Sequence, residues 1–224
     1  MHTSFFSILG LALLATSGYS HMYEAFPYPR GSPDNPKLPA SQRDPNIHTP
    51  ATQVCKGHPR AANTYELKAG ETLNVKVKGP SSAPPSAWAT HKGGHCQWGI
   101  SYDDGKTVAV FHRQDNTCGV QDDGKYDTVR EDYAIPIPKD IVNTDHAVFV
   151  WSWAAAQGGP YEMFQSCVDV SISGGKDGGS YTGDSLVYRN FPGAPDMPHW
   201  NGGKDPNFND FVKDIHPVTI SPSS

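Results

Sequence analysis

The sequence predicts an all-β protein, an immunoglobulin- or fibronectin-like antiparallel β-sandwich with long loops. The 224 residues include 22 glycines and 20 prolines, which interrupt the chain too often for long helices. Between these residues, short apolar segments alternate with turn formers, as the strands of a sandwich do. The Asp104-Gly105 step between two such segments is typical of a hairpin turn.

The predicted strands follow one another at roughly regular spacing through the middle of the chain. Each combines apolar residues in alternation with flanking turn residues. In chain order they are residues 72–79 (TLNVKVKG), 95–104 (HCQWGISYDD), 107–113 (TVAVFHR), 133–138 (YAIPIP), 146–156 (HAVFVWSWAAA) and 163–173 (MFQSCVDVSIS). Trp151 and Trp153 alternate in the fifth segment, so we expect both in the core on one face of a strand.

The two flanks of this strand-rich region have a different composition. Residues 21–60 contain eight prolines, which predicts an extended, irregular segment lying over the scaffold. Residues 174–224 are rich in glycine and proline, and we expect a C-terminal extension that is partly packed or flexible. Its aromatic residues would let it pack back onto the sandwich, and Val218-Thr219-Ile220 either forms one more edge strand or belongs to no element.

The N-terminus predicts a signal peptide over residues 1–20 and hence a secreted, extracellular protein. Residues 5–16 (FFSILGLALLAT) form an apolar core of about a dozen residues, too short to span a bilayer. Small residues at the cleavage positions allow two mature starts, His21 or Gly18, and we expect His21 because of the chemistry described below. The remaining residues, about 200, suit one domain, which we expect over residues 21–173 and in monomeric form.

Charge and cysteine content narrow the function classes. The net charge is -5 and no basic run occurs, which argues against a nucleic-acid partner, and no second long apolar run predicts a membrane anchor. The four cysteines predict two disulfides in an oxidising compartment, with three possible pairings. Of these we expect Cys55 with Cys167 and Cys96 with Cys118.

An N-terminal histidine offers a metal chelate that an internal histidine cannot form. Its α-amine and a ring nitrogen can bind one ion together, and a second histidine completes a set of three nitrogens. Such a set suits copper better than magnesium or calcium, and an α-amine loses its proton far more easily than a lysine does. We therefore expect one copper ion per chain, with His21 as a ligand.

The second ligand is expected to be His91, in the segment ATHKGGHC. Gly93 and Gly94 permit a tight backbone approach there, and a disulfide at Cys96 would hold the loop in position. His95 is the competitor, but a histidine at the start of a strand is more often structural than ligating.

Several segments together resemble the fungal lytic polysaccharide monooxygenases, most closely the chitin-active auxiliary activity family eleven. The matching pieces are HMYEAFPYPRGSP, CKGH, HKGGHCQWGISYDDGKT, AIPIP, AVFVWSWAA and EMFQSC, in the family's order over most of residues 21–173. The resemblance implies copper held by His21 and His91, a small-molecule or protein reductant, and oxidative cleavage of an insoluble polysaccharide. The family implies chitin as the substrate, and the sequence leaves cellulose, starch or a fungal-wall glucan as alternatives.

The resemblance also assigns roles to two residues near the predicted final strand. The family's axial position falls on Phe164, where many members have tyrosine, and phenylalanine cannot coordinate a metal. Glu162 would act beside the metal as a proton donor or hydrogen-bond partner, although an ordinary solvated carboxylate is an equal alternative. Tyr23, Phe26 and Tyr28 are candidates for a flat sugar-contacting face near the metal.

Two other functions remain open on the sequence. The first is a secreted copper-binding protein of the same fold without oxidative catalysis. The second is a non-catalytic carbohydrate-binding protein, for which His21 is incidental. A classical hydrolase is less favoured because neither a Gly-x-Ser-x-Gly nor a His-Glu-x-x-His motif occurs.

Overall fold

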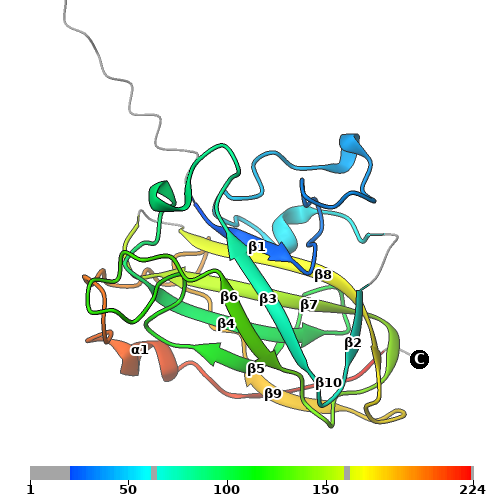
Figure 1. Cartoon of the computed structure of the whole chain (residues 1–224). Coiled ribbons are helices and arrows are strands. Elements are labelled where there is room, and N and C mark those ends of the chain that lie inside the picture. The colour runs from blue at the N-terminus through cyan, green and yellow to red at the C-terminus, as the bar shows by residue number, and fades with distance from the viewer. Residues whose placement is uncertain (1–20, 62–64, 159–161, 223–224) are drawn as a thin grey trace, which may run out of the picture.

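Two β-sheets lie face to face in the computed structural model, which describes residues 21–61, 65–158 and 162–222 (Figure 1). The predicted signal peptide, residues 1–20, lies outside the described residues. The smaller sheet has the strand order β1-β3-β6 and the larger one β10-β9-β5-β4-β7-β8-β2. The strands are β1 (Tyr23–Phe26), β2 (Tyr65–Lys68), β3 (Thr72–Lys78), β4 (Gly94–Ser101), β5 (Ala109–Gln114), β6 (Asp132–Pro136), β7 (Thr144–Ala155), β8 (Met163–Ser173), β9 (Tyr181–Ser185) and β10 (Pro217–Ile220).

The described helices are short, as the glycine and proline content predicts. They are α1 (Phe208–Val212) and the 3-10 helices η1 (Ala40–Gln42), η2 (Val54–Gly57) and η3 (Pro85–Ala87). Across the described part of the chain, no helix has the length and apolar character needed to cross a membrane.

The alternation of apolar residues explains how the smaller sheet packs. On β3, Leu73, Val75 and Val77 are buried, whereas Asn74 and Lys76 between them are exposed. The buried residues face the core that the two sheets share, and the polar residues face solvent. The all-β sandwich expected from the sequence is therefore confirmed.

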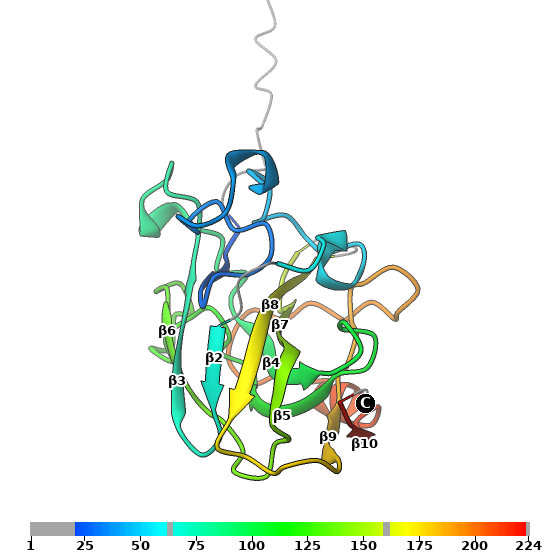
Figure 2. The same cartoon turned by 90° about the vertical axis from the view of Figure 1, so that its right-hand side faces the viewer.

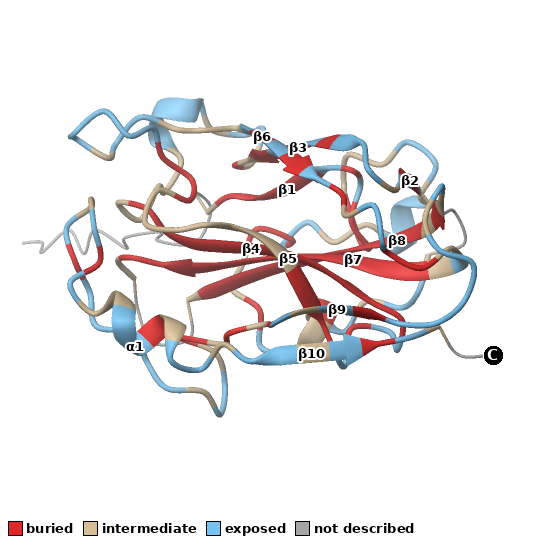
Figure 3. Cartoon of the chain, turned by 90° about the horizontal axis from the view of Figure 1, so that it is seen from below, coloured by how far each residue is buried: buried red, intermediate tan, exposed pale blue. Residues whose placement is uncertain are grey.

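The central strands of the larger sheet are buried on both faces, which Figure 3 shows as continuous red strands. One face packs against the smaller sheet, and Trp151 and Trp153 are fully buried there, as expected. The other face is covered partly by the C-terminal segment, where Trp200 and Phe211 pack on Ala154. Strands covered on both sides have near-continuous apolar sequences, which is why β7 is the longest apolar run in the middle of the chain.

The C-terminal segment is more integrated than its composition suggests. β9 pairs with β5, and β10 pairs with β9 over Pro217–Ile220, so the edge strand considered for residues 218–220 is present. Residues on both sides of position 173 thus share one sheet. In Figure 2, β9 and β10 form the edge of the larger sheet opposite to β2.

Three observations refine the expected antiparallel topology. The strands β1, β2 and β9, of four or five residues, were not expected. β2 pairs with β8 in parallel, with Tyr65 opposite Val170, whereas the other strand pairs within the two described sheets are antiparallel. The hairpin turn between β4 and β5 is confirmed, because Asp104 and Gly105 have φ values of 64° and 86°.

Both expected disulfides are confirmed. Cys55–Cys167 joins η2 to β8 with a Cα–Cα distance of 5.1 Å, and Cys96–Cys118 joins β4 to the loop after β5 with a distance of 5.3 Å. The second bridge anchors the start of β4 immediately after the loop that carries His91.

Candidate metal centre

The structure brings His21 and His91 together at one end of the sandwich. His21 precedes β1 and forms an isolated bridge with Ala89, while His91 lies in the loop before β4. The two imidazole rings stack with centroids 5.0 Å apart at an interplanar angle of 25°. Two side chains separated by 70 positions therefore meet as the sequence predicts.

The loop that presents His91 has a tightly turned backbone. His91, Lys92 and Gly93 all have positive φ values, of 49°, 58° and 106°. A Cβ atom on Gly93 would lie 2.3 Å from the backbone oxygen of Asn116, so only glycine fits there. The expectation that the glycines permit a close backbone approach is confirmed.

Hydrogen bonding determines which ring nitrogen of His91 is free. Nδ1 of His91 donates to the backbone oxygen of Gln157 at 2.5 Å, and this leaves Nε2 as the ring's electron-pair donor. Nε2 of His91 and Nδ1 of His21 are both buried without a hydrogen-bond partner. In His21, Nδ1 is the ring nitrogen that can close a small chelate ring with the residue's own backbone nitrogen.

Burial keeps these imidazoles neutral. It lowers the pKa of His91 to about 4, helped by the nearby His21 and opposed by the hydrogen bond to Gln157. Burial also lowers the pKa of His21, and the nearby charge of Glu162 opposes this shift, whereas His48 and Lys56 add to it. Neutral imidazoles near pH 7 have the free electron pair that a metal requires.

Glu162 lies beside the two histidines. Its Oε2 is 3.4 Å from Nδ1 of His91, and the potential ligand atoms of Glu162, His21 and His91 all lie within 4.8 Å of one another. This Oε2 is buried and has no hydrogen-bond partner. A Cβ atom on Gly158 would lie 1.7 Å from it, so glycine at position 158 makes room for the carboxylate.

Phe164 forms the apolar wall of the centre. Its ring centroid lies 5.1 Å from that of His21 and 5.4 Å from that of His91. Phe164 pairs with Trp153 across β8 and β7, and the two rings are in contact at 5.1 Å. This wall offers no atom that can coordinate a metal, so the ligands must come from the other sides.

This donor set fits a nitrogen-preferring ion. Two buried imidazole nitrogens without partners belong to two stacked rings, and removal of residues 1–20 would add an amine beside them. Three nitrogens favour copper over the oxygen-preferring magnesium and calcium. The unpartnered state of these atoms also gives a physical reason for a ligand, because buried polar groups are normally hydrogen-bonded.

His95 does not belong to the centre. Its ring is fully buried, with Nε2 3.2 Å from Oδ2 of Asp205 and Nδ1 3.3 Å from Oδ1 of Asp115. It stacks on Phe211 with centroids 4.2 Å apart. His95 therefore has a structural position, in which it holds the C-terminal segment on β4.

The flat face of Tyr23, Phe26 and Tyr28 expected near the metal is not formed, and this corrects the sequence interpretation. Tyr23 is buried, and its hydroxyl donates to Asp34. Phe26 and Tyr28 are exposed, but Phe26 packs against Tyr65. Tyr65 pairs with Val170, which is six residues along β8 from Phe164, or about 20 Å at 3.3 Å per residue.

Gln157 and Gly158 are parts of the centre that the sequence interpretation missed. Gln157 acts through its backbone oxygen, and any residue type has that atom, so no sequence signal could identify it. Gly158 could have been noticed from the Gln-Gly-Gly run, since consecutive glycines often mark a close backbone approach.

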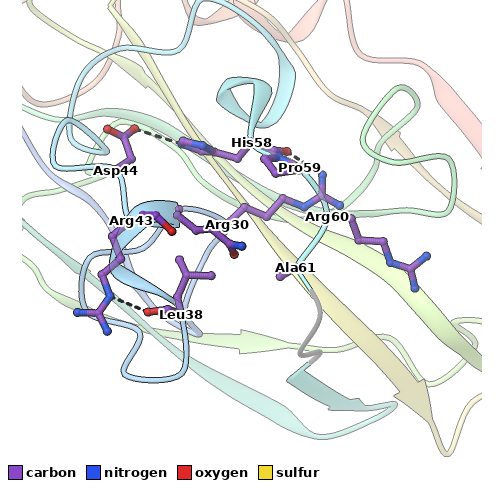
Figure 4. Close-up of a pocket in the computed structure, with 11 residues that line it drawn as sticks. Arg30, Leu38, Arg43, Asp44, His58, Pro59, Arg60 and Ala61 are labelled. Carbon is purple, nitrogen blue, oxygen red and sulfur yellow. Dashed lines mark hydrogen bonds and ion pairs between the residues drawn. The ribbon is translucent and has the colours of Figure 1, made fainter.

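One hollow in the described structure lies away from these residues. It has a volume of about 310 Å³ and lies between the loop before His48 and the segment around Pro59 (Figure 4). Figure 4 shows the ion pair of His58 with Asp44 at this hollow, and none of the predicted site residues lines it. The candidate chemistry is therefore at the histidine pair and not in this hollow.

Comparisons with known proteins identify one informative relative. The chain is 33% identical over 177 residues to the AA11 family lytic polysaccharide monooxygenase A of Aspergillus fumigatus, which covers 75% of this chain and 71% of the relative. No family model matches the sequence. A solved chitin binding domain from Burkholderia pseudomallei is 14% identical, covers 58% of this chain and 78% of that one, and has a TM-score of 0.34, too low to carry any argument.

Proposed function

This chain belongs to the AA11 family of lytic polysaccharide monooxygenases, and we propose that it is a secreted, copper-dependent enzyme that cleaves the glycosidic bonds of chitin by oxidation. The family membership supports a polysaccharide substrate and an external reductant. The proposal adds that the metal is copper, that the polysaccharide is chitin and that the protein is secreted.

One observation carries the copper assignment. Nδ1 of His21 and Nε2 of His91 are both buried without a hydrogen-bond partner, and they belong to rings stacked 5.0 Å apart. We propose that these atoms hold one copper ion together with the amine of His21. That amine forms only if the chain is cleaved after Ser20, so residues 1–20 are proposed to be a signal peptide.

Bound copper would supply one-electron chemistry with a reductant and with oxygen or peroxide. The protein groups around it have separate tasks. The carbonyl of Gln157 fixes the ring of His91, so that Nε2 remains the ligand atom. Phe164 lines the centre with an apolar ring and leaves the adjacent position without a protein ligand.

Glu162 is proposed to handle protons at the centre. Its Oε2 lies near both histidines and has no hydrogen-bond partner, so it is able to hold or release a proton beside the reacting atoms. The short distance between Glu162 and His91 would also be expected if Glu162 were a metal ligand. We favour the proton-handling role, because two imidazole nitrogens and the amine of His21 already supply three nitrogen ligands to the copper ion.

The test uses protein whose first residue is His21, loaded with one equivalent of copper. It is incubated with chitin and ascorbate, and the released oligosaccharides are analysed by mass spectrometry. We expect oxidised oligosaccharides from this protein and none from a His91→Ala variant. Tight copper binding without oxidised products from chitin, cellulose or other glucans would overturn the enzymatic proposal and favour a copper carrier.

A further inference from the structure

An amide pair lies directly beside the histidine centre. The backbone of Gln157 forms two hydrogen bonds with His91. The oxygen of Gln157 accepts from Nδ1 of His91, and the N–H of Gln157 donates to the backbone oxygen of His91 at 3.0 Å. The side chain of the same residue donates from Nε2 to Oδ1 of Asn201 at 3.1 Å. Asn201 is exposed and belongs to the C-terminal segment, which therefore reaches the edge of the proposed metal centre.

Neighbouring contacts hold Asn201 rigidly in this place. The preceding residue, Trp200, is 6% exposed, and its backbone N–H donates to the oxygen of Ala156 at 3.1 Å. The following residue, Gly202, lies so close to Tyr126 that a Cβ atom would be 2.4 Å from the tyrosine ring. An exposed amide fixed from both sides loses little conformational freedom when it binds a ligand.

The amide pair presents a defined hydrogen-bonding pattern. In this bond Nε2 of Gln157 donates to Oδ1 of Asn201, so the NH₂ group of Asn201 and Oε1 of Gln157 have no partner among the described residues. If both amides were rotated by 180°, the pair would still present one N–H donor and one oxygen acceptor. Either assignment leaves one donor and one acceptor, and the bond from Nε2 of Gln157 places the free donor on Asn201 and the free acceptor on Gln157.

We propose that Gln157 and Asn201 form a subsite for an acetamido group on the polysaccharide. An acetamido group has one C=O acceptor and one N–H donor, which complement the free donor and acceptor of the pair. A plain glucan has a hydroxyl at that carbon and lacks the carbonyl that the Asn201 donor would bind. This inference rests on the proposed function and adds the residues that select an N-acetylated sugar.

The test compares binding to chitin and to cellulose, which share the same backbone and differ in the acetamido group. Binding isotherms are measured with copper-loaded protein that begins at His21. In Asn201→Asp a carboxylate replaces the free donor, and Asn201→Ala removes the side chain. We expect both variants to bind chitin about tenfold more weakly, the equivalent of one lost hydrogen bond, with binding to cellulose unchanged.

Asn209→Ala is the matched control, because Asn209 is an exposed asparagine of the same C-terminal segment on α1. It should bind both polymers like the wild type. Unchanged chitin binding by both Asn201 variants, or equal losses on chitin and cellulose, would overturn the inference. Copper stoichiometry and melting temperature, measured alongside, show whether each variant is folded. Failure of the wild type to bind copper would instead refute the proposed function.

Discussion

The backbone oxygen of Gln157 accepts a 2.5 Å hydrogen bond from Nδ1 of His91. A carbonyl oxygen cannot donate, so Nδ1 must carry the proton and Nε2 must carry the electron pair. Position 157 thereby decides which atom of His91 can bind a metal. The same residue joins this centre to the C-terminal segment through its side-chain amide.

Extending the chain by one residue before His21 should weaken copper binding by more than about 100-fold. The extension turns the amine into an amide, and the loss of a direct ligand should exceed the 10- to 100-fold effect typical of outer-shell changes. Isothermal titration with a competing chelator measures the affinity. The metal-free melting temperature serves as the control, and equal affinities for the two proteins would refute the role of the amine.

His91→Ala and His95→Ala should differ in their effect on copper binding. The first should abolish copper binding, and it should lower the metal-free free energy of unfolding by about 1–3 kcal/mol, because the buried oxygen of Gln157 loses its hydrogen bond from Nδ1. The second should leave copper binding intact and lower the free energy of unfolding by about 2–4 kcal/mol, since Oδ2 of the buried Asp205 loses its bond to His95. Urea unfolding in EDTA and copper titration of each folded variant test this pair. Loss of copper binding in folded His95→Ala would contradict the placement of His95 outside the metal centre.

Glu162→Gln should reduce turnover by about 100-fold while copper affinity stays within about twofold, because a positioned acid or base contributes at least this much to rate. The variant keeps the shape of the side chain and removes its ability to ionise. Initial rates of oxidised product release are compared with copper titrations. A large loss of copper affinity would instead show that Glu162 is a metal ligand.

Phe164→Tyr should alter the electron paramagnetic resonance spectrum of bound Cu(II) without changing the stoichiometry. The ring lies 5.1 Å from that of His21, so an added hydroxyl would come close to the metal. Phe164→Leu, which adds no polar group, is the control for changed packing. Identical spectra for wild type and Phe164→Tyr would place the ring edge away from the metal.

Glu24 should make the stability of the protein depend on pH. This residue on β1 is fully buried, neither carboxylate oxygen has a hydrogen-bond partner, and burial raises its pKa well above the usual value of 4.5. The unfolded chain loses this proton above about pH 4.5, whereas the folded chain retains it. The free energy of unfolding should therefore fall as pH rises from that value towards the folded pKa.

Glu24→Gln removes this titration and keeps the side-chain shape. We expect the variant to be increasingly more stable than the wild type above pH 5, by up to about 1.4 kcal/mol per pH unit until the folded pKa is reached. Urea unfolding of both metal-free proteins between pH 4 and pH 8 measures the difference. A difference that does not change with pH would show that Glu24 titrates normally in the folded state.

The strands that could be predicted are those with a clear local pattern. β3 alternates buried and exposed residues, and β7 and β8 are long apolar segments, so each was visible in the sequence. The four residues of β2 have only two apolar members, and their strand conformation depends on pairing with β8. Short edge strands of this kind are stabilised by partners distant in sequence, which local patterns do not reveal.

The sequence by itself determined the strand-rich core, the number of disulfides and the two candidate histidines of the centre, because periodicity, cysteine number and side-chain chemistry are local properties. The tertiary structure alone decided that Nε2 of His91 is free, since the hydrogen bond responsible joins residues 66 positions apart. It also placed Phe26 and Tyr28 away from the centre and Asn201 beside it. These placements depend on strand register and on how the C-terminal segment packs, and both arise from contacts between distant residues.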